Sequence, residues 1–261
     1  NAYLVETQKA MERLSSDLLS ARQPEASDDV FLVDYDEHAE VKALAAMLYP
    51  YSKLPMAQLR KLVSGMSKVE RRRVMEAYLG RRENRRNKPG RALENIYYTF
   101  DILANYGMYR DLHRHRVLTQ ERQELTTLHG YDLPQELVEA GFKDQFEKCM
   151  QTADSAYREL AKEMPKQAQY IVPLAYKIRW YMTLNLRELF HLAELRSSVQ
   201  GHPDYRRIAQ KMYLEVKRVH PPLAEYMNFM DMSGGERLER LEAEKKTDRT
   251  KEEIEKKYGK K

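Results

Sequence analysis

The amino-acid sequence predicts an α+β fold, and two patterns of apolar residues lead to this class. In some segments, such as residues 95–103, apolar side chains alternate with their neighbours, which is typical of a strand. In others, such as residues 2–20, they recur every three or four positions, which is typical of a helix. The two kinds of segment do not alternate regularly along the chain, as they would in a parallel α/β sheet. An α+β arrangement is therefore favoured.

The elements can be placed in chain order. Strands are expected at residues 30–33, 95–103 and 176–183. Helices are expected at residues 2–20, 36–48, 68–79, 105–116 and 135–164, then from Asn185, from Pro203 as far as Pro221-Pro222, and in a short piece to about residue 230. Ser67 and Glu70 form an S-x-x-E capping box, which gives the helix over 68–79 a clear start. Residues 80–92 and 129–134 are expected to be a polar loop and a turn.

These elements divide the chain into three parts. Residues 1–29 are an N-terminal helix and linker, residues 30–232 an α+β domain, and residues 233–261 a charged tail, helical or disordered. The chain starts with Asn1 instead of Met, which fits a trimmed chain or a piece of a longer protein. No signal-peptide pattern precedes the first helix, so a cytoplasmic location is expected.

The composition supports a folded protein and excludes several classes. Of the 261 residues, 42% are hydrophobic and 33% charged, which allows a sizeable core and argues against disorder. No apolar stretch approaches the ~20 residues that a membrane-spanning helix needs. The single cysteine, Cys149, excludes an intramolecular disulfide and a multi-cysteine metal site. It shares a helical face with Phe142 and Phe146, so we expect it in the core.

Positive charge is concentrated in residues 68–91, which hold ten basic and three acidic side chains. The net charge of this segment is +7 and that of the whole chain is +5, so the remaining residues sum to about −2. The segment could bind phosphate or nucleic acid. It could equally be a solvated helix end followed by a loop. The second interpretation is favoured because no aromatic residue lies between Arg81 and Arg91 to stack on bases.

Two polar clusters could carry chemistry. The first comprises Arg110, His113, Arg114, His115 and Arg116, at the end of an expected helix. Grouped arginines suit phosphate because their planar fork donates bidentate hydrogen bonds. His113 and His115 lie two positions apart on that helix and would not face one ion, so no metal site is expected.

The second cluster follows the strand at 176–183 and comprises Asn185, Arg187, His191, Glu194 and Arg196. Arg187, His191 and Glu194 recur at i, i+4 and i+7, so they share one helical face. That face could be solvated, or it could line a cleft beside the aromatic strand. Strict motifs for phosphate loops, dinucleotide folds, zinc proteases and serine hydrolases are absent from the sequence.

Taken in order, the two clusters resemble the flavin-dependent thymidylate synthases. That family has an R-H-R motif after a strand, then a downstream helix with N-x-R that ends in L-R. Here Arg114-His115-Arg116 comes fourteen to sixteen residues after Phe100 of the strand that contains Y-T-F, and residues 185–196 read NLRELFHLAELR. The run FLVDYD at 31–36 and the helix after it resemble the family's opening strand and helix. The resemblance covers about residues 30–230 and implies a mixed or antiparallel sheet with long helices.

The resemblance also implies roles for individual residues. The positions that match flavin contacts of the family are Arg114, His115, Arg116, Asn185, Arg187 and His191. Arg196 matches an arginine that holds the phosphate of the nucleotide substrate, and Arg110 matches an arginine just ahead of R-H-R on the substrate side.

The sequence departs from the family pattern on the substrate side. Glu124 stands where the family has a serine central to the substrate site, Thr126 replaces an arginine, and Gln169 replaces a second arginine. Further departures are Asn95, Asp111, Arg122 and Thr119, of which Thr119 is a mild change. A carboxylate repels an anionic nucleotide in a site of low dielectric constant. No catalytic residue is assigned, and the flavin side is better kept than the substrate side.

Three functions remain open. The first is methylation of dUMP to dTMP with methylenetetrahydrofolate, FAD and NADPH. The second is a paralogue that has lost this reaction and binds flavin or is structural. The third is a nucleic-acid-binding module that uses residues 68–91. The resemblance favours the first two, with nucleotide and folate partners and a homotetramer that holds each flavin between subunits.

Overall fold

The computed structural model describes residues 1–25, 28–234 and 240–258 of the chain. The expected linker at 21–29 includes residues 26–27, and the expected tail at 233–261 includes 235–239 and 259–261, which lie outside the described residues. Within the described residues, no helix is both long and apolar enough to cross a membrane.

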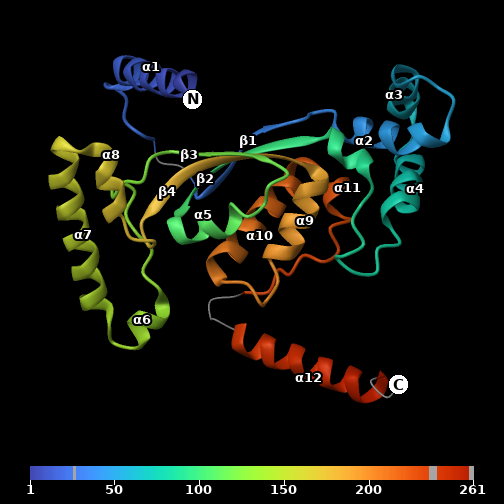
Figure 1. Cartoon of the computed structure of the whole chain (residues 1–261). Helices are drawn as coiled ribbons and strands as arrows, with labels where there is room; N and C mark the ends of the chain where they lie inside the picture. The colour runs from blue at the N-terminus through green and yellow to red at the C-terminus, as the bar shows by residue number, and fades with distance from the viewer. Residues whose placement is uncertain (26–27, 235–239, 259–261) are drawn as a thin grey trace.

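The centre of the molecule is a four-stranded sheet in the order β1-β2-β4-β3 (Figure 1). Its strands are β1 (Val30–Tyr35), β2 (Tyr97–Asn105), β3 (Thr119–Arg122) and β4 (Lys177–Asn185). Every pairing is antiparallel, and β2 and β4 pair over nine positions. With the helices around this sheet, the predicted α+β class is confirmed.

The strand β3 was missing from the sequence prediction. Its four residues, TQER, are polar and give no alternating apolar signal. It forms because β4 offers a free edge, and Thr119 to Arg122 pair with Thr183 to Trp180 along it. A short polar edge strand of this kind depends on its partner and not on its own side chains.

The helices surround the sheet unevenly. Their bounds are α1 (Ala2–Leu19), α2 (Ala39–Leu48), α3 (Met56–Gly65), α4 (Lys68–Leu79), α5 (Tyr106–Leu112), α6 (Gln135–Glu139), α7 (Lys143–Glu163), α8 (Pro165–Ala168), α9 (Leu186–Arg196), α10 (Pro203–Val219), α11 (Pro221–Ala224) and α12 (Arg240–Tyr258). Short 3-10 turns cover Tyr49–Tyr51, Arg91–Asn95 and Gln169–Ile171. Figure 1 shows α5, α9 and α10 beneath the sheet, α2 to α4 at one end, and α6 to α8 at the other.

The core lies between the sheet and the helices α9 and α10. Alternate strand residues such as Phe100 and Met182 are fully buried and face Phe190 and Met212 of the helices. The side chains between them in sequence point to the opposite face, where Phe31, Val33, Tyr97 and Tyr181 are exposed. The period-two pattern of the strands therefore separates a packed face from an open one.

Two predicted helices change their bounds. The helix expected at 135–164 is divided into α6 and α7, because Gly141 has a φ of +78° and turns the chain between them. The helix expected at 105–116 ends at Leu112 as α5. The backbone then turns, with the amide of His115 bonded to the carbonyl of Leu112. The R-H-R segment consequently lies in a loop.

The expected burial of Cys149 is wrong, because its side chain is exposed. The buried face of α7 keeps Phe146 of the predicted stripe but contains Met150 in place of Cys149. Met150 is buried, and Phe146, Ala153 and Tyr157 pack beside it against the core. Phe142, assigned to the same stripe as Cys149, is also exposed.

Candidate functional site

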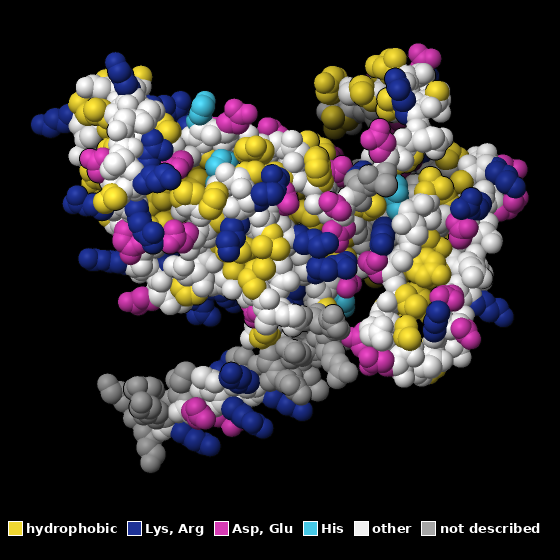
Figure 2. Space-filling model, turned by 180° about the vertical axis from the view of Figure 1, so that it is seen from behind, with side chains coloured by type: hydrophobic (Ala, Val, Ile, Leu, Met, Phe, Trp, Pro, Cys, Tyr) yellow, Lys and Arg dark blue, Asp and Glu magenta, His cyan; other side chains and the backbone are white. Residues whose placement is uncertain are grey.

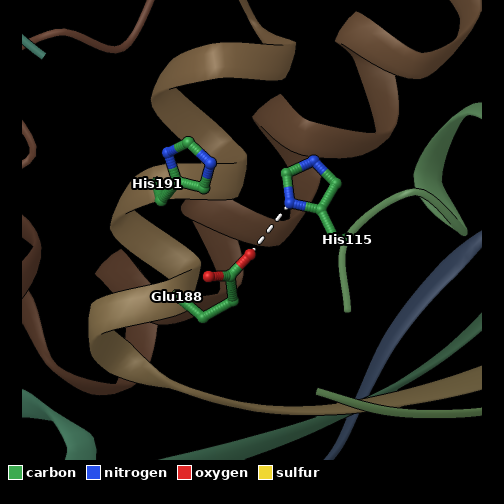
Figure 3. A group of neighbouring side chains, drawn as sticks. All are labelled: His115, Glu188 and His191. Atoms are coloured by element: carbon green, nitrogen blue, oxygen red, sulfur yellow. Dashed lines mark hydrogen bonds and ion pairs between the residues drawn. The ribbon is translucent and has the colours of Figure 1, made fainter. Parts of the chain in front are cut away.

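His115 joins the two polar clusters of the sequence. Its side chain is only 4% exposed, and its two ring nitrogens meet two residues of α9. Nδ1 lies 2.9 Å from Oε1 of Glu188, and Nε2 lies 3.0 Å from Nε of Arg196. Figure 3 shows His115 reaching from the loop after α5 toward Glu188 on α9.

These contacts fix the proton of His115. The Nε atom of an arginine always donates, so Nε2 of His115 must be the unprotonated acceptor. The ring proton therefore lies on Nδ1 and is donated to the carboxylate of Glu188. Both nitrogens of the imidazole are committed to protein groups.

Arg196 is held at the last turn of α9 by three contacts. Besides His115, its Nη2 donates to the backbone carbonyl of Asp111 at 2.8 Å. Its guanidinium lies over the ring of Tyr205, 5.3 Å from the centroid. Nη1 makes no hydrogen bond with any described residue, and an oriented guanidinium with free N–H groups suits an anion.

The start of α9 is set by Asn185, at the junction with β4. Its Oδ1 accepts from the amide of Glu188 at 2.9 Å and caps the helix. The next polar residue, Arg187, donates to the carbonyl of Pro89 at 2.8 Å and pairs with Glu94 at 3.0 Å. The N-x-R pattern therefore both begins the helix and fastens the preceding loop to it.

His191 lies one turn after Glu188 on α9 and is half-buried. Its ring centroid is 5.6 Å from that of His115. Burial lowers the pKa of the His191 imidazole, Glu188 partly restores it, and His115, Lys88 and Arg85 lower it further. Two side chains of the loop at residues 80–92, the basic loop, are therefore close enough to act on this histidine.

Arg82 of the basic segment has a structural role. Arg82 forms a bidentate pair with Glu194 at 2.8 and 2.5 Å, with both side chains at least 94% buried. Its guanidinium lies between the rings of Phe190 and Phe229, 5.2 Å from each centroid. Glu194 was predicted to share a polar face with Arg187 and His191, but it is in the core as the partner of Arg82.

The exposed arginines and lysines of the same loop differ from Arg82. They make no ion pair with any described residue, and they are Arg81, Arg85, Arg86 and Lys88. Figure 2 shows Lys and Arg side chains mixed with Asp and Glu at the α3–α4 end of the molecule. Lys88 and Arg85 are thus available to an anion beside His191.

The other arginines of the first cluster are at the surface. Arg110 and Arg116 are exposed and make no hydrogen bond or ion pair with a described residue. Arg114 is exposed and pairs with Asp111 at 3.1 Å. Of the R-H-R segment, only the histidine is built into the protein interior.

Three of the residues that depart from the family pattern, Arg122, Glu124 and Gln169, line a separate hollow. A cavity of about 450 Å³ is lined by Gln8, Tyr109, His113, Gln120, Glu121, Arg122, Glu124 and Gln169. Gln169 accepts from the amide of Leu125 at 2.9 Å and so holds the loop after β3. With Glu121 and Glu124 opposed by Arg122 alone, the lining is acidic on balance.

His115, Glu188 and His191 also resemble a metal-ligand set, because one ligand atom of each lies within 4.8 Å of the others. The protonation of His115 argues against this use. Its Nδ1 carries a proton, and its Nε2 faces the N–H of Arg196. An ion would have to displace one of these hydrogen bonds, since a metal needs a free lone pair.

Glu188 is the site residue that sequence reasoning missed. It stands outside the matched positions of the resemblance, and only its spacing could have suggested it. It is three residues before His191 and three after the capping Asn185, so it lies on the same side of α9 as His191.

Comparison with known proteins agrees with this architecture. The sequence model of the family described as thymidylate synthase complementing protein matches residues 31–222. A protein of Chlamydia muridarum named "UPF0159 protein" is 44% identical over 212 residues, which is 81% of this chain and 40% of the relative. One from Thermoplasma acidophilum, "UPF0159 protein Ta1429", is 36% identical over 83% of this chain and 44% of its own length.

A third relative has a functional name. The "Flavin-dependent thymidylate synthase" of Sulfurisphaera tokodaii is 31% identical over 144 residues, which is 52% of this chain and 56% of the relative. The chain spans less than half of the length of the two more similar relatives. Because the family model covers more than half of its residues, the chain belongs to the thymidylate synthase complementing protein family, as a divergent relative of the flavin-dependent thymidylate synthases.

Proposed function

We propose that this protein binds FAD and acts as a flavin-dependent enzyme of the thymidylate synthase type. The observation that carries the proposal is the meeting of His115 and Arg196, which are 81 positions apart in sequence. A loop histidine and a helix arginine that match flavin and phosphate contacts of the family are joined by a hydrogen bond. Family membership and the printed names of distant relatives support the same conclusion.

The donors around this pair suit a dinucleotide. FAD carries two phosphates and a ring system rich in hydrogen-bond acceptors, and it needs cations and N–H donors near the phosphates. Arg114, Arg116 and Nη1 of Arg196 offer such donors, and Lys88 and Arg85 act on the adjacent His191. Asn185 and Arg187 are used within the protein, so their contribution is to place α9.

When bound, FAD would supply hydride transfer, with NADPH as its reductant. The residues of this chain bind and orient. Arg196 holds an anionic group through its free Nη1, and His115 fixes the plane of that guanidinium. His191 stays neutral near pH 7 because its pKa is lowered, so it can accept or donate one hydrogen bond without adding charge. The Arg82–Glu194 pair holds the basic loop over α9.

The substrate side supports a second candidate function. Glu124 and Glu121 line the cavity, and their carboxylates oppose a nucleotide phosphate there. A paralogue that binds flavin but has lost dUMP methylation is consistent with this lining. If dUMP methylation is retained, the nucleotide and the folate must avoid these carboxylates or the loop must move.

We extend the proposal to assembly and location. The open sheet face, with exposed Phe31, Val33 and Tyr97, supports a homo-oligomer, and the family resemblance favours a tetramer. Residues 30–232 would be the folding unit, and the cytoplasm the location. A nucleic-acid partner is not favoured, since no aromatic residue lies between Arg81 and Arg91 to stack on bases.

The absorption spectrum of the purified protein, taken before and after addition of FAD and desalting, tests the first proposal. Retained flavin bands support it, and titration with dUMP would then separate the two candidate functions. Arg116→Ala should weaken FAD binding about tenfold, since a hydrogen bond to a charged group contributes about 1.5–3 kcal/mol. Unchanged affinity in a folded variant would contradict the role of Arg116. Arg22→Ala, far from the R-H-R segment in sequence, is the matched control.

A further inference from the structure

We infer that Glu188 is a positioning residue, which fixes the tautomer of His115 and through it orients Arg196 toward an anion. The inference rests on the proposed function only for the identity of that anion. Glu188 matches none of the positions that the family resemblance assigned. Its place in the site follows from its contact with His115 (Figure 3).

The first argument is the direction of the hydrogen bonds. Glu188 accepts the Nδ1 proton of His115, which leaves Nε2 with a lone pair that accepts from Arg196. Without an acceptor at Nδ1, the neutral ring can place its proton on Nε2 instead. That proton would face the N–H of Arg196, and two opposed donors repel. The carboxylate of Glu188 therefore selects the one neutral tautomer that can hold Arg196.

The second argument compares two helix starts. Glu70 is the third residue of α4, and its carboxylate accepts from the backbone amide of the capping Ser67 at 2.8 Å. Glu188 is the third residue of α9, and its helix is also capped by a side chain. Its carboxylate is directed to His115 and does not close a capping box. Helix capping therefore does not account for this glutamate.

The third argument is burial. The side chain of Glu188 is 11% exposed and that of His115 is 4% exposed, so water cannot readily replace either partner. A hydrogen bond to a charged acceptor strengthens in such surroundings. Nη2 of Arg196 is held independently by the carbonyl of Asp111. With Nε and Nη2 both fixed, the plane of the guanidinium is set and Nη1 is left for a ligand.

The tautomer can be measured without any ligand. In protein labelled with ¹⁵N-histidine, the ring nitrogen shifts distinguish a protonated from an unprotonated nitrogen, and a His115→Gln variant identifies the signals among the seven histidines. We expect the Nδ1–H form in the native protein and in Glu188→Gln, whose amide oxygen still accepts. Glu188→Ala should lose it. Glu70→Ala, which removes the carboxylate from the same helix position of α4, is the control and should retain it.

The second readout is anion binding, with dUMP and deoxyuridine as the two probes. The ratio of their affinities reports the contribution of the phosphate. Glu188→Ala should reduce this ratio about tenfold, while Glu188→Gln and Glu70→Ala keep it within about twofold. A structural role alone would weaken both probes equally and would not be rescued by glutamine.

The outcomes separate this inference from the proposed function. An Nε2–H or charged His115 in the native protein overturns the inference, as does an unchanged tautomer in Glu188→Ala. Binding of one equivalent of zinc with Nδ1 of His115 as a ligand would also overturn it. If neither probe binds but the tautomer follows Glu188, the positioning role stands and the nucleotide assignment fails. If Glu188→Ala does not fold, Glu188→Gln must still keep the native tautomer and affinity ratio.

Discussion

The cluster around His115 and the cavity beside Glu124 are built in opposite ways. In the first, buried side chains from distant segments bond to one another, as His115 does with Glu188 and Arg196. In the second, residues of β3 and of the segments around it, several of them exposed, line an open hollow. A buried network tolerates few substitutions, because each lost partner leaves a group unsatisfied. A loop can exchange residues at little cost in stability, so chemistry changes there first.

The largest expected effect is on protein stability, through the buried Arg82–Glu194 pair that packs next to the His115 cluster. Arg82→Ala leaves Glu194 as an unpaired charge in the core and should lower the free energy of unfolding by about 3–5 kcal/mol. Urea denaturation followed by circular dichroism measures this change. Arg81→Ala, one position earlier and exposed, should change stability by less than about 0.5 kcal/mol. Equal effects of the two substitutions would contradict the anchoring role of Arg82.

The next effect is on the ligand and not on the fold. Arg196→Ala removes the donor that His115 and Asp111 orient, and should weaken binding of an anionic ligand about tenfold to a hundredfold. Calorimetric titration with dUMP, and flavin retention on desalting, would record it. Arg207→Ala on α10 is a suitable control, since its only described ion pair is a 4.0 Å contact with Asp29. Retained binding in Arg196→Ala would locate the anion elsewhere.

Substitutions beside the cavity should strengthen ligand binding, whereas Arg196→Ala weakens it. Replacing Glu124 by Ser together with Thr126 by Arg removes a negative charge and adds a positive one, so dUMP affinity should rise about tenfold at low salt. The gain should shrink as salt increases, because both positions are near solvent. No gain in calorimetry would mean that the site differs from the family pattern at more than these two positions. Arg196→Ala and this double variant thus test the two regions separately.

The sequence predicts those elements that depend on local patterns, and it does not predict those that depend on contacts between distant segments. The strands β2 and β4 and the capped helix α4 follow local patterns, so their residues predict them. The edge strand β3 and the exposed Cys149 depend on partners that a sequence window does not contain. The same holds in the site. A resemblance can propose His115 and Arg196, but Glu188 and the burial of Glu194 emerge only when the helices pack.

The smallest expected effect is the contribution of His191, in the His115 cluster, to the pH dependence of the unfolding free energy. Burial lowers the pKa of His191 below that of the unfolded chain, so the unfolded state takes up the proton first as pH falls. The contribution of neutral His191 is therefore complete above the unfolded value of about 6.5 and is lost as pH falls below it. Between pH 7.5 and 5.5, His191→Gln should show a weaker decline of unfolding free energy than the native protein, by less than about 1.4 kcal/mol for each pH unit. A steeper decline in the variant would mean that Glu188 outweighs burial, and that His191 carries the charge in the folded state.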